Sequence, residues 1–355
     1  MVRWLKRIGL SLLVLVGLSL AGGVAYEQLA RNQARKAYPA PGRLVDIGGG
    51  RHIQIDCRGQ GGPTVVFESG LDTLGSLSWD AVHDKVAQTT RACAYSRAGV
   101  MWSDPAPRPF SATHVAQDLH AALAAVGEKG PYVLVGHSLG GPYLMTFVGL
   151  YGGDVAGVVL VDASHPDQID RLRAAGGQGV SAQLAQAKLA GALAWTGIVR
   201  AVTSQSPPVP PTAPAAIRGP AAAWLPQTLG APIDETQGLV DTLATAGRTR
   251  QLGDRPLVVL THGAETSPEV LKAQKVTAQQ DRAMTLAWQR MQGEEARWST
   301  HSRHQIVADA SHYIQFDRPD VVIAAVREVV EDVRVSRPAA TSTPPHVPGP
   351  GQGHP

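Results

Sequence analysis

The sequence predicts an α/β fold, in which a mostly parallel sheet of eight strands is covered by helices on both faces. Short, apolar, β-branched runs alternate with segments of helical periodicity, which is typical of strands buried on both sides of a parallel sheet. The chain has 355 residues, of which 44% are hydrophobic, so it is long enough to enclose a large core. We expect the strands near residues 43–47, 52–56, 64–68, 91–95, 132–135, 157–161, 257–260 and 305–308.

Helical patterns lie between these runs, notably at residues 111–126, 140–150 and 319–333. The alternation stops between residues 166 and 255, where Ala-rich helical sequence is interrupted by several prolines. Because a compact domain rarely contains a structureless loop of that length, we interpret this segment as a helical cap inserted after the sixth strand. Its Pro-rich part, residues 207–214, is expected to be mobile.

The N-terminus has the pattern of a membrane segment. No charged side chain occurs from Ile8 to Ala25, and a helix of that length covers roughly 27 Å of a bilayer core about 30 Å thick. Arg3, Lys6 and Arg7 precede the run, so the positive-inside rule predicts a single-pass protein whose globular part is extracytoplasmic, either periplasmic or at the cell surface. The alternative is a signal peptide cleaved near Gly23–Ala25, which would give a secreted protein.

These patterns divide the chain into four parts. Residues 1–26 form the anchor or signal segment, and the polar, basic residues 27–41 form a juxtamembrane helix or spacer. The globular domain is expected at residues 42–335, with the cap at about 166–255. Residues 336–355 are rich in Pro and Gly and lack apolar residues to bury, which predicts a disordered tail.

Composition excludes several classes of function. Lys and Arg number 32 against 29 Asp and Glu, and this net charge of +3 is too small to indicate nucleic-acid binding. Two cysteines, Cys57 and Cys93, exclude a disulfide-dense scaffold or a Cys-rich zinc module. The sequence contains no phosphate-binding Gly-rich loop or dinucleotide motif, so we expect neither a cofactor nor a metal. It indicates no particular protein partner.

One motif carries chemistry. Gly136-His137-Ser138-Leu139-Gly140 follows a predicted strand and precedes a predicted helix, which is the GxSxG pattern in its strand-turn-helix context. A serine in so tight a turn must hold strained backbone angles, which small neighbours such as Gly136 and Gly140 permit. The turn would project Ser138 Oγ into the crevice, and the helix N-terminus would direct the Leu139 N–H at a developing oxyanion.

The sequence resembles the α/β-hydrolase fold superfamily over roughly residues 42–333. The segments that carry the resemblance are 65–70, 95–99, 102–105, 130–141, 160–163 and 311–314. It is similar to the branch with a cap after the sixth strand, which includes esterases, lipases, C–C bond hydrolases and haloperoxidase-like enzymes. Related haloalkane dehalogenases and epoxide hydrolases have an aspartate nucleophile, so Ser138 disfavours those two activities.

The resemblance implies a histidine and an acid for Ser138. His312, on the loop after the last strand, fits the expected base better than His301 or His304, which precede or enter that strand. Two acids remain open. The usual loop after the seventh strand offers Glu265, although not at the usual position, whereas some branches use the end of the sixth strand, where Asp162 stands. We favour Asp162.

The resemblance also implies an oxyanion site and places the two cysteines on neighbouring strands. The second oxyanion donor would be the Leu71 N–H, on the loop after the third strand, beside that of Leu139. Cys57 and Cys93 would either form a cross-strand disulfide in an oxidising compartment or remain free buried thiols.

Together these features predict a serine hydrolase that cleaves an ester or related acyl bond of a small, apolar substrate through an acyl-enzyme. Two alternatives stay open: an acyltransferase that uses the same triad, and a non-catalytic ligand-binding protein on the same fold.

Overall fold

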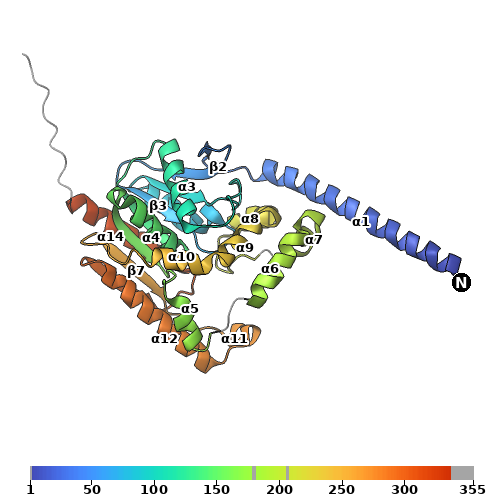
Figure 1. The fold of residues 1–355 in the computed structure, drawn as a ribbon. Coiled ribbons are helices and arrows are strands. Elements are labelled where there is room, and N and C mark those ends of the chain that lie inside the picture. The colour runs from blue at the N-terminus through green and yellow to red at the C-terminus, as the bar shows by residue number, and fades with distance from the viewer. Residues whose placement is uncertain (1, 178–180, 205–207, 337–355) are drawn as a thin grey trace, which may run out of the picture.

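The computed structural model describes residues 2–177, 181–204 and 208–336 (Figure 1). At its centre is an eight-stranded sheet with the order β1-β2-β4-β3-β5-β6-β7-β8. The strands are β1 Arg43–Asp46, β2 His52–Arg58, β3 Thr64–Glu68, β4 Ala92–Ser96, β5 Tyr132–His137, β6 Val155–Val161, β7 Leu257–His262 and β8 Ser302–Val307. Strand β2 is antiparallel to both of its neighbours, and every other pairing is parallel.

The predicted fold class is confirmed, with small shifts in strand boundaries. The largest shift is in β8, which begins at Ser302 rather than near residue 305. It is the last strand of the sheet order, and its burial is partial along most of its length. A polar, half-exposed edge strand gives a weak apolar signal, and this explains the shift.

Two helical layers cover the sheet (Figure 1). Helices α2 Asp80–Ala87 and α14 Pro319–Ser336 bury their valines in one core with the inner residues of the central strands. Helices α3 Ala112–Ala125 and α4 Gly140–Tyr151 form the core of the opposite face. This two-sided burial explains why the central strands are apolar on both faces.

The cap lies between β6 and β7, as predicted. Its elements are α5 Gln168–Ala174, α6 Ser181–Leu193, η3 Ala194–Thr196, α7 Ile198–Thr203, α8 Ala215–Thr228, α9 Gly230–Gln237 and α10 Leu239–Ala246. After β7 come α11 Pro268–Gln274 and α12 Ala278–Glu295, and α13 Ile314–Asp317 follows β8. Pro207 lies outside the described residues, and the mobility of the Pro-rich segment stays a prediction.

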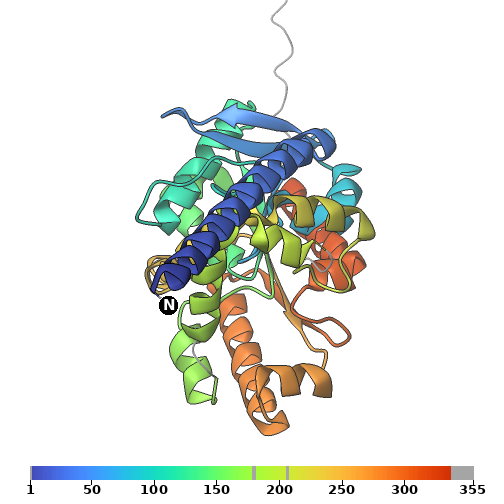
Figure 2. The ribbon, with the colours of Figure 1, turned by 90° about the vertical axis from the view of Figure 1, so that its right-hand side faces the viewer.

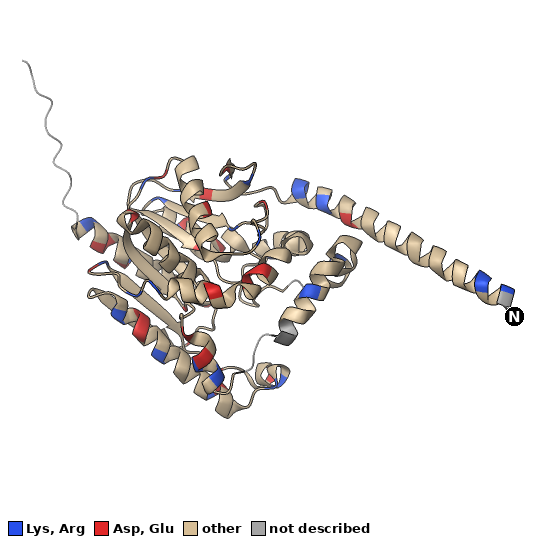
Figure 3. Ribbon diagram, viewed as in Figure 1, with Lys and Arg blue, Asp and Glu red and all other residues tan. Residues whose placement is uncertain are grey.

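The N-terminal helix differs from the prediction in its length. Helix α1 runs without interruption from Val2 to Ala37 and projects from the domain (Figures 1 and 2). Of the two states expected for residues 27–41, juxtamembrane helix or spacer, the structure has the helix as far as Ala37. The Glu27–Arg31 pair, one turn apart and at 2.9 Å, supports it. An 18-residue window of α1 has a mean hydropathy of 2.2 and none of it is buried, so its length and composition suffice to cross a membrane. Charged side chains occur only toward its two ends (Figure 3).

The C-terminal boundary shifts by one residue. Ser336 belongs to α14, whereas residues 337–355, which contain the rest of the predicted tail, lie outside the described residues.

Of the two states left open for the cysteines, the structure has the disulfide. Cys57 of β2 and Cys93 of β4 are direct partners in the antiparallel register, with their Cα atoms 4.0 Å apart. The bridge therefore links the antiparallel edge of the sheet to its parallel centre.

We expect the double variant Cys57→Ala/Cys93→Ala to fold but to unfold at lower denaturant concentration. Cross-linking residues 36 apart restricts the unfolded chain, an effect worth about 3–4 kcal/mol in the loop-entropy model. Urea unfolding of the variant and of the reduced parent protein should give the same lowered midpoint. A midpoint equal to that of the oxidised parent would show that the bridge does not stabilise the fold.

Candidate active site

Ser138 occupies the sharp turn between β5 and α4. Its φ angle is +50°, in the left-handed region that a residue with a side chain rarely adopts. The turn leaves no room for larger neighbours: a Cβ on Gly140 would lie 2.6 Å from the Glu68 carbonyl oxygen, and one on Gly136 would lie 3.0 Å from the Gly140 carbonyl carbon. The two glycines therefore permit the turn, as the sequence pattern indicates.

Backbone hydrogen bonds hold this turn. The Ser138 N–H donates to the Val161 carbonyl at 3.1 Å, while the Ser138 carbonyl accepts from Gly141 N–H at 3.0 Å and from Ser164 N–H at 2.9 Å. The strained residue is thus fixed from β6 and from its own helix, so its side chain is presented in one orientation.

His312 lies on the loop between β8 and α13 and faces Ser138. Its Nε2 is 2.9 Å from Ser138 Oγ. His137 contacts the same loop, because its Nε2 lies 2.8 Å from the His312 carbonyl oxygen. Burial and the neighbouring His312 lower the pKa of His137 to about 3, so this imidazole is neutral and its Nε2–H donates a hydrogen bond to that carbonyl.

Asp162 completes a hydrogen-bonded chain. It follows β6 with a φ of +47°, is fully buried, and places Oδ2 2.5 Å from His312 Nδ1. Glu265, the other acid considered, is exposed on the loop after β7. The structure therefore brings Asp162, and not Glu265, to His312.

The two competing histidines lie elsewhere. His304 is within β8 and its Nε2 lies 2.8 Å from Thr261 Oγ1, and His301 is 3.6 Å from Asp332 on α14. Both belong to the sheet edge and its surface rather than to the crevice at Ser138.

Sequence reasoning missed two further partners of Asp162. His262, the last residue of β7, approaches Oδ2 with its Nδ1 at 2.7 Å and donates its backbone N–H to Oδ1 at 3.0 Å. Trp288 of α12 donates its indole N–H to Oδ1 at 2.9 Å. With His312, Asp162 thus has three partner residues and four hydrogen bonds, two for each oxygen. The sequence offered one clue to His262: this residue directly precedes Gly263, at the start of the loop after β7 that carries Glu265.

These contacts decide the charge of the carboxyl group. Burial alone would raise the pKa of Asp162, but hydrogen bonds from His262 and His312 outweigh burial and hold this pKa well below its usual range. Asp162 is therefore ionised at neutral pH. The same contact raises the pKa of His262 above its usual value near 6.5, against the opposing effect of burial.

The loop after β3 carries the predicted oxyanion donor, Leu71. A Cβ on Gly70 would lie 2.9 Å from Ser138 Cβ, so the backbone of this loop passes directly over the serine. Leu139, the other predicted donor, follows Ser138 and is the N-cap residue of α4. Among the described residues, no backbone carbonyl accepts the N–H of Leu71 or Leu139.

Arg97, which follows β4, binds the backbone of the loop after β3. Its guanidinium donates to the carbonyl oxygens of Ser69 and Gly70, each at 2.7 Å. The C=O and N–H of a trans peptide point in opposite directions. The bond from Arg97 to the Gly70 carbonyl therefore turns the Leu71 N–H away from Arg97.

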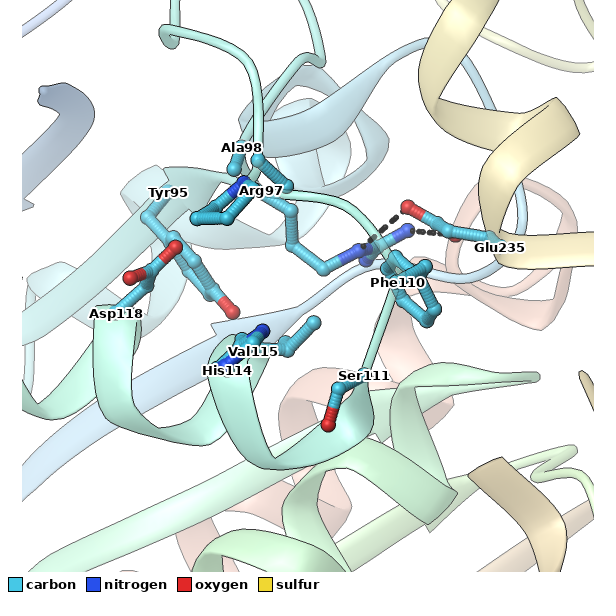
Figure 4. A pocket seen from close by; sticks show the side chains of 11 residues that line it. Tyr95, Arg97, Ala98, Phe110, Ser111, His114, Val115, Asp118 and Glu235 are labelled. Carbon is cyan, nitrogen blue, oxygen red and sulfur yellow. Dashed lines mark hydrogen bonds and ion pairs between the residues drawn. The ribbon is translucent and has the colours of Figure 1, made fainter. Parts of the chain in front are cut away.

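Arg97 is itself held by two buried carboxylates. It pairs with Glu68 at 2.7 Å and, through two hydrogen bonds of 2.9 and 3.1 Å, with Glu235 of the cap helix α9 (Figure 4). Tyr95 donates its hydroxyl to Glu68. Burial raises the pKa of Glu68 to about 7 despite the nearby Arg97, and it also raises the pKa of Glu235. One cation between two buried acids thus joins the cap to the loop that carries Leu71.

Three side-chain clusters in the described residues have the composition of metal ligands, and in one of them, Cys57, Cys93 and Glu128, the two cysteines are bridged to each other. Asp162, His262 and His312 offer atoms within 4.8 Å of one another, but these atoms are already hydrogen-bonded to each other. His165, Asp167 and Glu294 form the third group, in which Arg250 and Arg171 pair with the two carboxylates.

Comparison with known sequences gives the family. The model of the alpha/beta hydrolase family matches residues 53–325. The chain is 25% identical over 181 residues to the uncharacterized protein YbdG of Bacillus subtilis, covering 48% of this chain and 55% of that protein. It is 33% identical over 108 residues to an uncharacterized vacuolar membrane protein of Saccharomyces cerevisiae, covering 30% of this chain and 17% of that protein. The chain thus spans only part of the length of these curated relatives.

Solved structures share the fold. A thermophilic esterase from Thermogutta terrifontis has a TM-score of 0.51 at 19% identity, over 82% of this chain and 97% of that one. Est816, described as an N-acyl homoserine lactone degrading enzyme, has a TM-score of 0.55 at 19% identity, over 81% and 100%. An epoxide hydrolase from Bacillus megaterium has a TM-score of 0.55 at 14% identity, over 81% and 99%. With the family model covering most of the chain, the protein belongs to the alpha/beta hydrolase family.

Proposed function

We propose that this protein is a serine hydrolase that cleaves an ester or related acyl bond of a small, apolar molecule. The observation that carries the proposal is the chain of hydrogen bonds from Ser138 Oγ through His312 to the buried Asp162. A serine, a base and an orienting acid in this geometry are the parts that acyl transfer to a hydroxyl requires.

In the first half of the reaction, Ser138 Oγ attacks the acyl carbon while His312 Nε2 takes its proton. The negative charge that develops on the acyl oxygen accepts hydrogen bonds from the N–H groups of Leu71 and Leu139. His312 then gives its proton to the leaving alcohol, and the acyl group remains on Ser138. In the second half, His312 takes a proton from water, and the resulting hydroxide attacks the acyl carbon. The bond between that carbon and Ser138 Oγ then breaks as His312 returns the proton to Oγ, and the acid is released.

Asp162 acts on His312 rather than on the substrate. Its Oδ2 accepts the Nδ1–H of His312, which leaves Nε2 free to receive the serine proton. The His312 side chain is 39% exposed and that of Asp162 is 0% exposed, so solvent and substrate reach the base but not the acid. Trp288 and His262 are positioning residues, because they hold Asp162 in this orientation.

We also propose that α1 anchors the protein in a membrane, with the domain of residues 42–335 on the extracytoplasmic side. Arg3, Lys6 and Arg7 before the apolar run favour this orientation. The disulfide between Cys57 and Cys93 supports it, because disulfides persist in oxidising compartments.

We expect Ser138→Ala to abolish labelling by a fluorophosphonate probe and to lower the turnover of short p-nitrophenyl esters by at least about 10⁴-fold. Asp162→Asn should lower kcat by a similar order, because the amide no longer fixes the His312 tautomer. Glu265→Gln is the matched control and should retain the activity of the parent.

Other outcomes of this experiment separate the alternatives. Labelling of Ser138 without ester hydrolysis, together with acyl transfer to an added alcohol, would indicate an acyltransferase. Folded protein that neither labels nor turns over would indicate a ligand-binding protein.

We expect the stability lost in His262→Gln to depend on pH. Because the pKa of His262 is raised in the folded state, its contribution is full below about pH 6.5 and is lost as pH rises through the folded value. Urea unfolding should therefore show a larger deficit at about pH 5.5 than at about pH 9.

His304→Gln provides the control for this pH dependence. Burial lowers the pKa of His304, so its contribution is present above about pH 6.5 and is lost at lower pH, which is the opposite trend. Equal deficits at both pH values in His262→Gln would contradict the assignment of its charge.

We expect Glu235→Gln to lower kcat about ten- to hundredfold with little change in KM. Weakening the support of Arg97 should misplace the Leu71 N–H, which matters in the transition state more than in substrate binding. The matched control is Glu294→Gln, which removes one charge from the ion pair with Arg171 of the cap helix α5. Equal losses in both variants would contradict a specific role for Glu235.

A further inference from the structure

The cap exposes a set of large apolar side chains that the proposed reaction does not use. We call this set the cap patch; its members lie on α6, η3 and α7 and are 38% to 72% exposed: Leu189, Leu193, Trp195, Ile198 and Val202. Gathered apolar side chains on a surface mark a contact with another apolar phase or with a partner.

The α6 members of the patch point away from the domain. A Cβ on Gly191 would lie 2.9 Å from Ile233 Cδ1, so the Gly191 face of α6 packs against α9. Leu189 and Leu193 each lie two residues from Gly191, which is roughly 200° around an α-helix. They therefore occupy the face of α6 opposite to α9.

The patch adjoins α1 where the apolar run of that helix ends. A Cβ on Gly23 would lie 2.2 Å from the Thr196 carbonyl oxygen, and one on Gly197 would lie 2.8 Å from the Gly23 carbonyl oxygen, so the two backbones touch. Ile198 lines one apolar groove together with residues of α1 between Leu12 and Tyr26. The start of α7 thus lies level with the last residues of the uncharged run.

An ion pair fixes this arrangement. Glu27 of α1 accepts two hydrogen bonds from Arg200 of α7, at 2.8 and 2.9 Å, and both side chains are buried. Arg200 also donates to the Ala223 carbonyl at 2.7 Å. Lys188 and Arg200 are the charged residues between positions 181 and 204, so with Arg200 buried this segment of the cap exposes a single charge (Figure 3).

The direction of the cap helices matches a flat surface. In Figures 1 and 2, α6 and α7 cross the axis of α1 at a steep angle instead of running along it. A bilayer spanned by α1 lies across that axis, and its surface would therefore run along α6 and α7.

We propose that the cap patch rests on the surface of the bilayer that α1 spans, with Trp195 and its apolar neighbours in the interfacial layer. This inference rests on the proposed membrane anchor. Trp and aliphatic side chains are favoured at the membrane–water interface, where their apolar parts leave water. The partner of the patch is thus the lipid itself, and the cap of the proposed hydrolase is held against the leaflet.

The test uses the full chain in vesicles of phosphatidylcholine and phosphatidylglycerol, with an environment-sensitive fluorophore on a single introduced cysteine. Val202→Cys reports on the cap patch. Val240→Cys on α10, an equally apolar residue that is 65% exposed, is the matched control. Because Cys57 and Cys93 are bridged, the fluorophore reacts with the introduced thiol.

We expect the label at position 202 to shift its emission to shorter wavelength and to be quenched by nitroxide lipids, while the label at 240 does neither. Water-like emission at both positions, in protein that resists carbonate extraction, would overturn the inference and leave the anchor intact. A blue shift at 202 without quenching by lipid would also overturn it, because a second copy of the chain would then cover the patch. Extraction of the protein by carbonate would refute the anchor and the inference with it.

A charge placed in the patch gives a second, independent test. With the label at Leu189→Cys on α6, Val202→Glu should return the emission toward that in water, whereas Val240→Glu should leave it unchanged. Both variants should keep the turnover of a soluble p-nitrophenyl ester, which shows that they fold. An unchanged emission in Val202→Glu would overturn the proposed contact.

Discussion

The buried carboxylate of Asp162 is the interaction on which the candidate site depends. A carboxylate removed from water without partners would cost several kcal/mol, and here each oxygen has two partners. These partners come from β7, α12 and the loop after β8, which lie 100 to 150 residues away in sequence. One charge therefore holds together three segments that meet only when the sheet is complete, and the same contacts fix the orientation of His312.

The parts of the site that follow from short-range sterics could be predicted from the sequence. The turn at Ser138 needs small neighbours within two residues, so the GxSxG motif alone is enough to predict the turn. The choice between Asp162 and Glu265 could not be made in that way, because both follow parallel strands whose ends meet at one edge. The path of the chain after β7 separates them: it brings the His262 side chain to Asp162 and leaves Glu265 in solvent.

Contacts between segments that are distant in sequence could not be predicted from local sequence patterns. Arg97 and Glu235 are 138 residues apart, and each could equally be a surface charge when seen in its own segment. Only the packing of α9 over the sheet buries both and joins them. The choice between a juxtamembrane helix and a spacer at residues 27–41 stayed open for a related reason. The polar residues of this segment suit either state, and it is the ion pair of Glu27 with Arg200 of the cap that accompanies the helix.

The continuous helix α1 gives the domain a defined orientation with respect to any membrane that α1 spans. A flexible linker would let the domain turn freely, whereas here the Tyr38 carbonyl, just beyond α1, accepts hydrogen bonds from the indoles of Trp102 and Trp224. Helix α6, which carries part of the cap patch, packs through Gly191 on α9, and α9 carries Glu235. Contacts therefore run without a break from the outer side of the cap to the loop that bears Leu71. The position of α9 and the geometry of the loop that bears Leu71 thus depend on the same packing.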